Sequence, residues 1–378
     1  MDFPRPEFMR LALRLARKGI PRTSPNPAVG AVLVRGGKVV GSGYHRSAGM
    51  PHAEIEAIRD AGRRARGADL YVTLEPCAHT GRTGPCTEAI AAAGIRRVAS
   101  AMEDPNPLVR GKGFRRLRKA GILVHSGLLE REARSLNEPF CRWIVAGRPF
   151  VTLKLALSLD GQIAAASGSS RWITGESARR MVHRMRARSD AVLVGGKTFR
   201  ADDPLLTARV PGARNPVRVV LTSDLSGAAR SRMMRERGRG TLFVCPKGVP
   251  AWSVDRLREG GARVLLLPSR NGRVGAGVFL AALGREGITS LLVEGGGETA
   301  GWLVSAGAVD RFVLFVAPLL LGEGVRSLTG FAAATPGKGK RLSFTSVRRV
   351  GEDLMIAAEP AGGPKGATGR KPGGRAGE

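Results

Sequence analysis

Two stretches decide the character of the N-terminal third, Pro51-His52-Ala53-Glu54 and Pro76-Cys77-Ala78-His79-Thr80-Gly81-Arg82-Thr83-Gly84-Pro85-Cys86. A histidine and two cysteines supply the nitrogen and sulfur ligands that zinc prefers, and they leave a fourth tetrahedral position for water. Zinc acidifies such a water toward neutrality, and a nearby carboxylate can then move protons. The pattern therefore predicts a zinc site with the ligands His52, Cys77 and Cys86 and with Glu54 as the general acid and base.

This ligand set is typical of hydrolytic deaminases that act on amino-substituted pyrimidines and purines. A lone histidine or cysteine is more often an interior residue, but the four residues together reverse that expectation. Deaminases of nucleic acids and of free cytidine usually carry Pro-Cys-x-x-Cys, whereas eight residues separate Cys77 from Cys86. We expect the inserted residues, which include Arg82, to form a loop that contacts the substrate.

The zinc residues fall where predicted helices and strands meet. Hydrophobic periodicity predicts a helix over 53–65 with Pro51 in its first turn, so that His52 and Glu54 share its N-terminal end. Cys77 follows a predicted strand over 69–74. Cys86 precedes a helix that begins near Thr87, where the helix dipole favours a thiolate.

The bulk composition predicts a cytosolic protein of two domains. A chain of 378 residues exceeds what one core usually serves, and its 43% hydrophobic content can fill two. No run is long and apolar enough for a membrane span, and the N-terminus lacks a signal-peptide core. Cys141 and Cys245 are isolated and fit small buried hydrophobic positions in a reducing compartment.

The formal net charge of +30 raises the question of nucleic-acid binding. Only 11 of the 61 basic residues are lysine, and the arginines are spread along the chain instead of gathering in a patch. The aromatic content of 5% is poor for a surface on which bases stack. We therefore interpret the charge as a habit of composition and do not expect a nucleic-acid partner.

The second half alternates strands and helices and predicts a largely parallel α/β sheet. The pattern breaks at Ala146-Gly147-Arg148-Pro149 before a strand over 150–157, and a helix is predicted over 177–188. A closing hairpin is predicted over 342–358. The predicted domains are residues 1–146 and 147–360, followed by a basic, disordered tail over 361–378. Further strands are predicted at 191–194, 217–222, 241–244, 263–267, 290–293 and 311–316.

The zinc motifs, preceded by Thr23-Ser24-Pro25-Asn26-Pro27-Ala28-Val29-Gly30 and followed by Asp104-Pro105-Asn106-Pro107, resemble the bifunctional riboflavin-biosynthesis deaminase/reductases. The resemblance spans nearly the whole chain. It implies a cytidine-deaminase-like zinc domain followed by a dihydrofolate-reductase-like domain. In the second half it rests on Lys154-Leu155-Ala156-Leu157-Ser158-Leu159-Asp160-Gly161, Ser170-Arg171-Trp172-Ile173-Thr174, Asp202-Asp203-Pro204-Leu205-Leu206-Thr207 and Val293-Glu294-Gly295-Gly296-Gly297.

The resemblance implies two consecutive reactions on one phosphoribosyl-aminopyrimidine. Zinc-dependent hydrolysis would deaminate 2,5-diamino-6-(5-phosphoribosylamino)pyrimidin-4(3H)-one, and NADPH would then reduce the ribosyl group of the resulting uracil to a ribityl chain. It places Asn26, His45 and Asn106 in the deaminase pocket. Each asparagine stands beside a proline, so the alternative for both is a role in turns.

The resemblance also supplies the predicted reductase site, where the residues alone say less. Residues 293–301 pattern as a strand end, a glycine cluster and a helix start, which lets backbone N–H groups approach a phosphate. Arginine suits the substrate phosphate because its guanidinium can hold two oxygens. Lys154 and Asp160 lie in a suggestive segment, but no reductase acid is assigned. The implied NADPH contacts are Ala156, Trp172, Thr198, Asp202, Ser223, Gly296, Gly297, Glu298, Thr299, Ala300, Gly301 and Trp302, and the implied substrate contacts are Ser170, Arg186, Leu206, Arg209 and Glu294.

Two alternatives stay open. An RNA-directed zinc deaminase with an accessory nucleotide-binding domain would explain the +30 charge, although the spacing of the two cysteines speaks against it. A nucleotide-binding protein with one inactive half is the other. The oligomeric state, including whether the chain forms a homo-oligomer, is not determined by the sequence.

Overall fold

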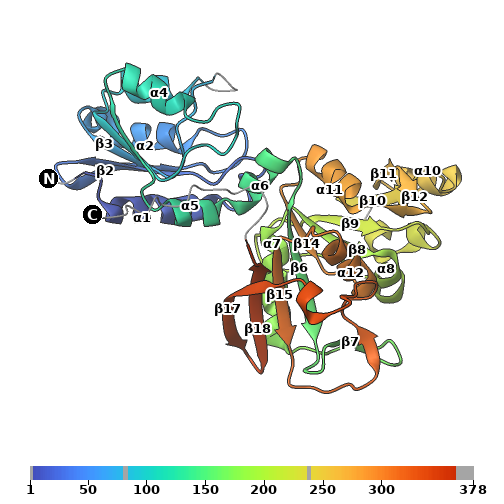
Figure 1. The fold of residues 1–378 in the computed structure, drawn as a ribbon. Coiled ribbons are helices and arrows are strands. Elements are labelled where there is room, and N and C mark those ends of the chain that lie inside the picture. Colours follow the sequence, from blue (N-terminus) through green and yellow to red (C-terminus); the bar gives the residue numbers. More distant parts are fainter. Residues whose placement is uncertain (1–2, 80–83, 236–239, 363–378) are drawn as a thin grey trace. The chain divides into compact units, whose positions relative to one another are not determined.

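The computed structural model describes residues 3–79, 84–235 and 240–362 (Figure 1). It divides into two compact units, Met1–Phe150 with Leu280–Ser290, and Val151–Phe279 with Leu291–Glu378. The division at residue 150 lies close to the boundary predicted after residue 146. From residue 363 on, the predicted tail falls outside the described residues. No helix in the described part of the chain combines the length and the apolar character that crossing a bilayer requires.

The first unit is built on a five-stranded sheet in the order β2-β1-β3-β4-β5. β1 runs antiparallel to both β2 and β3, whereas β3, β4 and β5 are parallel. In Figure 1, α1 and α5 lie along one side of this sheet and α2 and α4 along the other. The strands are β1 Gly30–Arg35, β2 Lys38–Tyr44, β3 Asp69–Val72, β4 Arg97–Ser100 and β5 Leu123–Ser126, and the helices are α1 Pro6–Ala16, α2 Ala53–Ala61, α3 Cys86–Ala92, α4 Lys112–Lys119, α5 Glu130–Leu136 and α6 Glu138–Ala146.

Glycines in β2 let α2 pack directly against the sheet. A Cβ atom on Gly43 would lie 2.6 Å from the Ala53 carbonyl oxygen, and one on Gly41 would lie 2.5 Å from that of Ala57. Real Cβ atoms do not come so close, so only glycine allows this approach. This close packing fixes the first turn of α2, which carries Glu54 and directly follows His52.

α2 is shorter than the helix predicted over 53–65. It ends at Ala61, and residues Gly62–Ala65 continue as a turn of 3₁₀ helix. Gly62 has a φ of +54°, a left-handed value that glycine adopts easily and that ends the α-helix. Pro51 precedes the helix instead of occupying its first turn, because His52 is the N-cap residue.

The second unit contains a nine-stranded sheet in the order β11-β10-β9-β8-β14-β6-β15-β18-β17. Neighbouring strands pair in parallel along the run β11, β10, β9, β8 and β14, and β6 pairs in parallel with β15. These pairs confirm the predicted, largely parallel sheet. The predicted closing hairpin is also confirmed, because β17 and β18 are antiparallel. The strands are β6 Phe150–Leu157, β8 Ala191–Gly195, β9 Val217–Leu221, β10 Thr241–Pro246, β11 Arg263–Leu267, β14 Ser290–Val293, β15 Arg311–Val316, β17 Leu342–Val350 and β18 Asp353–Pro360.

Helices and a small second sheet complete the unit. β7 pairs with β16 away from the main sheet, and β12 pairs with β13. The helix predicted over 177–188 is α7, which begins one residue earlier. The remaining elements are β7 Gln162–Ala165, β12 Ser269–Arg270, β13 Arg273–Val274, β16 Gly324–Arg326, α7 Glu176–Arg188, α8 Gly196–Asp202, α9 Arg232–Arg235, α10 Ala251–Glu259, α11 Ala276–Arg285 and α12 Gly297–Ser305.

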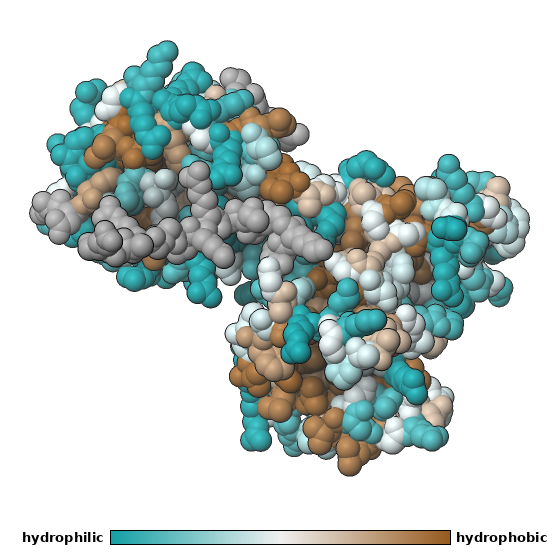
Figure 2. All heavy atoms as spheres, in the orientation of Figure 1, coloured by the Kyte–Doolittle hydropathy of each residue, from teal (hydrophilic) through white to brown (hydrophobic). Residues whose placement is uncertain are grey.

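One edge of the large sheet exposes apolar side chains. β17 is the last strand of the sheet, and Phe344 and Val347 on it are 73% and 58% exposed. Figure 2 shows hydrophobic surface gathered over β17 and β18. Monomeric proteins rarely leave a long apolar edge strand exposed.

Candidate active sites

The ends of α2 and α3 bring the predicted zinc ligands together. His52 caps α2, and Cys86 is the first residue of α3 instead of the residue before it. The Nδ1 atom of His52 lies 3.2 Å from the Cys86 Sγ and 3.6 Å from the Cys77 Sγ. The three ligand atoms all fall within 4.8 Å of one another.

This cluster fits zinc by its chemistry. One imidazole nitrogen and two sulfurs are a donor set that structural and catalytic zinc sites share, and a site with three protein ligands leaves a position for a water. Hydrogen bonding from Cys86, and then from His52, lowers the pKa of the Cys77 thiol despite its burial. A lowered thiol pKa favours the thiolate, which is the form that binds a cation.

Glu54 lies beside the cluster, in the first turn of α2, and is 4% exposed. Burial of the carboxyl raises the pKa of Glu54 to about 7, although the positive charge of His52 acts in the opposite direction. A carboxyl with a pKa near neutrality can both accept and return a proton at physiological pH. Glu54 therefore has the position and the acidity of a proton shuttle.

Asn26 and His45 form a short chain of hydrogen bonds that leads to the ligand His52. The Asn26 amide nitrogen lies 3.2 Å from His45 Nε2, and His45 Nδ1 lies 3.1 Å from the Pro51 carbonyl oxygen. Burial lowers the pKa of His45. Because a carbonyl oxygen only accepts hydrogen bonds, His45 donates to it from Nδ1. The structure thus joins two of the predicted pocket residues to the segment that carries His52.

Asn106 lies in a different loop and makes a local turn. Its Oδ1 accepts the Leu108 N–H at 3.0 Å, and its own N–H is donated to Asp104 Oδ1 at 2.8 Å. These are the turn contacts that the neighbouring prolines suggested as the alternative, and the role of Asn106 in the deaminase pocket stays a prediction. The predicted substrate loop around Arg82 falls on residues 80–83, outside the described residues.

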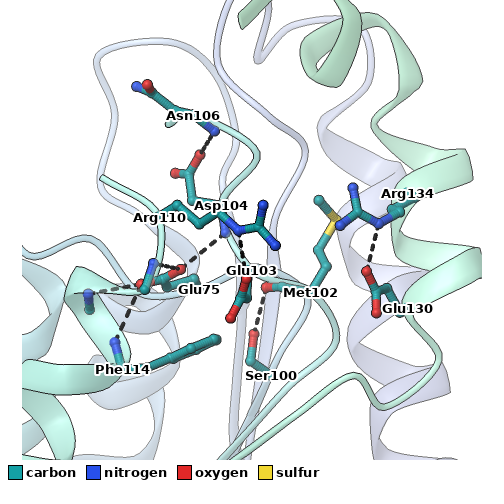
Figure 3. A network of polar contacts seen from close by, with 12 residues as sticks. Glu75, Ser100, Met102, Glu103, Asp104, Asn106, Arg110, Phe114, Glu130 and Arg134 are labelled. Carbon is teal, nitrogen blue, oxygen red and sulfur yellow. Dashed lines mark hydrogen bonds and ion pairs between the residues drawn. The ribbon is translucent and has the colours of Figure 1, made fainter. Parts of the chain in front are cut away.

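A buried carboxylate beside the zinc site was missed by the sequence analysis. Glu75 is 5% exposed and accepts hydrogen bonds from the backbone N–H groups of Asp104, Gly111, Gly113 and Phe114 (Figure 3). The signal in the sequence is that Glu75 is a charged residue placed directly between the strand predicted over 69–74 and the Pro-Cys motif. It stands two residues from a zinc ligand.

The second unit has a cavity of about 1350 Å³ where the predicted reductase residues meet. It is large enough for a dinucleotide and a second small molecule. Among the predicted residues that line it, Trp172 is 69% exposed and flanks Arg179 through a cation–π contact of 4.4 Å. The predicted residues in the wall are Ala156, Ser170, Trp172, Arg186, Thr198, Asp202, Leu206, Arg209, Ser223, Glu294, Gly296, Gly297, Glu298, Thr299 and Trp302.

Two predicted cofactor residues do not line the cavity. Ala300 and Gly301 lie in α12 and are buried against the rest of the unit. A Cβ atom on Gly301 would come within 2.0 Å of the Thr329 carbonyl oxygen, so this glycine permits close packing. Both residues are buried within α12, whereas Glu298, Thr299 and Trp302 of the same helix lie in the cavity wall.

Thr198, which the family resemblance assigns to the cofactor site, holds the glycine segment that follows β14. The Gly296 N–H donates to Thr198 Oγ1 at 3.0 Å, and Lys197 forms an ion pair with Glu298. The turn is ordered, since Gly196 begins α8 and Lys197 follows in it. α8 and the N-terminus of α12 therefore form one wall of the cavity.

Glu294 is the centre of a buried ion cluster. Its side chain is 6% exposed, and Arg186 holds it with two nitrogens at 2.6 Å and 2.9 Å, while Lys154 Nζ lies 3.6 Å away. Burial alone would raise the pKa of Glu294, but Arg186 and Lys154 outweigh that effect and lower it to about 2. Arg186 is committed to this carboxylate, whereas the other predicted arginine, the exposed Arg209, forms no ion pair with any carboxylate of the described residues.

The loop from Asp203 to Arg209 is strained. Asp203, Leu206 and Arg209 have φ values of +39°, +53° and +49°, in the left-handed region that side chains disfavour. Such strain collects at functional sites, where surrounding structure maintains it. Leu206 and Arg209 both line the cavity.

Asp160 lies outside the cavity wall. Its carboxylate accepts the N–H groups of Leu321 and Gly322, at 3.2 Å and 2.7 Å, and the Ser158 hydroxyl. It therefore braces the turn after β6. Lys154, from the same motif, does line the cavity.

Comparisons with known proteins extend over both units. Residues 4–102 match the model of the cytidine and deoxycytidylate deaminase zinc-binding region, and residues 149–356 match the RibD C-terminal domain. The riboflavin biosynthesis protein RibD of Aquifex aeolicus is 44% identical over 350 residues, which cover 92% of this chain and 96% of that protein. The RibD protein of Escherichia coli is 41% identical over 367 residues, covering 92% of this chain and 97% of its own.

Solved structures agree. RibD of Acinetobacter baumannii superimposes with a TM-score of 0.86 at 36% identity, covering 94% of this chain and 98% of its own. A diaminohydroxyphosphoribosylaminopyrimidine deaminase/5-amino-6-(5-phosphoribosylamino)uracil reductase from Thermotoga maritima gives 0.82 at 34% identity, with the same coverage of the two chains. The predicted fold, a cytidine-deaminase-like zinc domain with a dihydrofolate-reductase-like domain, is confirmed.

Proposed function

The chain belongs to the family of bifunctional riboflavin-biosynthesis deaminase/reductases, and from this premise we propose how its residues divide the two reactions. Residues 1–146 form the zinc-dependent deaminase, and residues 147–360 form the NADPH-dependent reductase. The deaminase acts first, on 2,5-diamino-6-(5-phosphoribosylamino)pyrimidin-4(3H)-one. The reductase then converts the resulting 5-amino-6-(5-phosphoribosylamino)uracil to its ribitylamino 5'-phosphate.

One observation supports the deaminase assignment above all others. A histidine and two cysteines present three ligand atoms within 4.8 Å, and the buried Glu54 lies beside them. Bound zinc supplies an acidified water for hydrolysis. His52, Cys77 and Cys86 hold the metal, and Glu54 carries a proton from the water to the departing amine. Asn26, His45 and Asn106 position the pyrimidine.

In the reductase, the protein orients two ligands. NADPH supplies the hydride when it is bound. The segment Gly296–Thr299 with Thr198, Asp202 and Ser223 receives the cofactor, since these residues line one wall of the cavity. Arg209 binds the substrate phosphate, because Arg186 already holds Glu294 with two nitrogens.

The partner is a free phosphorylated metabolite and not a nucleic acid. The eight-residue spacing of the two cysteines and the presence of a complete reductase unit support this proposal. We also propose that the protein works in the cytoplasm, where its four free cysteines stay reduced.

A coupled assay tests the proposal. The purified protein, supplied with the diamino substrate and NADPH, should release ammonia and then oxidise NADPH, and it should contain about one zinc per chain. NADPH oxidation that precedes ammonia release would contradict the order of reactions. Efficient deamination within RNA, with a steep dependence on salt, would favour the RNA-directed alternative.

A further inference from the structure

Glu75 is a buried carboxylate that the two reactions do not use. It accepts four backbone N–H groups, and no lysine or arginine of the described residues forms an ion pair with it. A carboxylate so far from water is stable only where such donors surround it. Four donors on one buried carboxylate are not a chance contact. We call the Glu75 carboxylate with these four backbone N–H groups the Glu75 joint.

All four donors belong to one segment of the chain. Glu75 Oε2 accepts from Asp104 at 3.1 Å and from Gly111 at 2.9 Å, while Oε1 accepts from Gly113 at 2.8 Å and from Phe114 at 3.3 Å. Figure 3 shows the Glu75 side chain reaching into the loop that runs from Asp104 to Phe114. The Glu75 carboxylate thus holds in place a loop that would otherwise open locally as one unit.

The same loop carries Asn106. Asn106 donates its N–H to Asp104 Oδ1, and Asp104 donates its own N–H to Glu75 Oε2. Asp104 therefore links Asn106 to Glu75. Gly113 adds a steric contact, because a Cβ atom there would lie 2.1 Å from the Pro76 carbonyl oxygen. Glu75 and Pro76 directly precede the ligand Cys77.

The ligand itself has separate supports. The Cys86 N–H donates to Cys77 Sγ at 3.3 Å, and the Thr87 N–H donates to the Cys77 carbonyl oxygen at 3.2 Å. These contacts with α3 do not involve Glu75. Loosening the Glu75 joint should therefore shift the loop of Asn106 more than it shifts the metal ligands.

We propose that Glu75 is a positioning residue of the deaminase, which fixes the Asp104–Phe114 loop and with it Asn106 against the zinc-ligand segment. The proposal rests on the proposed role of Asn106 in the deaminase pocket. It gives Glu75 a role in substrate placement that is separate from metal binding and from proton transfer.

The test is Glu75→Gln in the full-length zinc enzyme. The amide keeps the shape of the side chain but turns an NH₂ group toward two N–H donors, which opens the joint. The KM for the diamino substrate should rise about tenfold, while zinc content and kcat stay close to those of the unaltered enzyme. Reduction of the already deaminated substrate should not change, which shows that the chain is folded.

The matched control is Glu103→Gln. Glu103 directly precedes the loop and pairs with Arg110 at an exposed position, and none of its hydrogen bonds or ion pairs among the described residues involves Glu75. Its KM should stay within about twofold of the unaltered value, because exposed ion pairs contribute little. An unchanged KM in Glu75→Gln, or loss of zinc as its main effect, would overturn the proposal.

A double-mutant cycle identifies the residue through which Glu75 acts. If the joint works through Asn106, the effects of Glu75→Gln and Asn106→Ala on KM should not add. Full additivity would contradict the proposal. Should Glu75→Gln fail to fold, hydrogen exchange of the unaltered enzyme decides instead: the amides of Asp104, Gly111, Gly113 and Phe114 should be protected, and fast exchange would overturn the joint.

These outcomes are separate from the proposed function. An unaltered enzyme that releases no ammonia from the diamino substrate contradicts the proposed function itself. An active unaltered enzyme with no response to Glu75→Gln contradicts only the role of Glu75.

Discussion

In the deaminase unit the reacting groups converge on a point, whereas in the reductase unit they surround a space. Three ligand atoms lie within 4.8 Å of one another, and Glu54 is buried beside them. The reductase cavity has a volume of about 1350 Å³, and its wall draws on strands, helices and loops from most of the unit. Both sites belong to one chain and act on successive forms of one substrate.

The difference follows from the chemistry. Hydrolysis at a metal needs a few atoms at fixed distances, so the protein concentrates its contribution in a few side chains. Hydride transfer needs two ligands held in register, and the cofactor supplies the reactive atom. Single substitutions should therefore abolish deamination, whereas each single substitution in the reductase cavity should reduce hydride transfer only in part.

The largest effect is expected from Cys86→Ser. A serine hydroxyl keeps the size of the side chain but does not replace a thiolate as a zinc ligand. Zinc content should fall from about one per chain toward zero, and deamination should disappear, while reduction of the deaminated substrate continues. Metal analysis and the two separate assays measure this. Retention of both zinc and deamination would show that Cys86 is not a ligand.

Glu54→Gln should leave the metal and remove the proton carrier. General acid and base catalysis contributes about a hundredfold to ten-thousandfold in rate, and kcat for deamination should fall by that range. Zinc content distinguishes this variant from Cys86→Ser. Deamination at the unaltered rate would assign proton transfer to another group.

Glu294→Gln should weaken the reductase unit, because Arg186 and Lys154 would face each other without their carboxylate. Breaking a buried ion cluster costs about 3 to 5 kcal/mol of unfolding free energy at pH 7. Denaturant unfolding measures the loss. The matched control is Glu176→Gln, whose exposed ion pair with Arg180 should change stability by less than about 0.5 kcal/mol.

The same cluster predicts a dependence on acid. The pKa of Glu294 is about 2 in the folded protein and 4.5 ordinarily, so its ionisation stabilises the fold above the ordinary value. This stabilisation, about 3 kcal/mol, is lost as the pH falls from about 5 to about 2. The stability of Glu294→Gln should lack this component, and parallel pH profiles of the two proteins would contradict the assignment.

The smallest effect is expected from Thr198→Val. The substitution preserves shape but removes the oxygen that accepts the Gly296 N–H. Losing one neutral hydrogen bond costs about 1 kcal/mol, so the KM for NADPH should rise about fivefold. The KM for the pyrimidine is the internal control. An equal rise in both would show that Thr198 shapes the whole cavity and not the cofactor wall alone.

Local patterns predicted the deaminase site because its residues stand at the ends of elements with strong signals. His52 and Cys86 mark the starts of α2 and α3, and the strand of β6 was predicted with its observed bounds. α4 was not predicted, since Lys112–Lys119 is dominated by basic residues. Only Phe114 and Leu117, three positions apart, are large apolar residues that it buries.

Long-range contacts account for what the sequence did not predict. The donors to Glu75 lie 29 to 39 residues away, at a distance where no periodicity connects them. Ala300 and Gly301 belong to the same glycine segment as Gly297, but they are buried in α12 and do not line the cavity. In such cases the fold decides which member of a motif reaches the site.

The left-handed residues of the Asp203–Arg209 loop have a consequence for binding thermodynamics. Each such conformation costs about 1 kcal/mol, and the folded unit bears it before any ligand arrives. Asp203 is fastened by the Arg232 N–H at 2.9 Å, so the loop is already close to one shape. A substrate that binds this loop, as we propose, loses little affinity to ordering of the protein, and the strained residues lower the stability of the ligand-free enzyme.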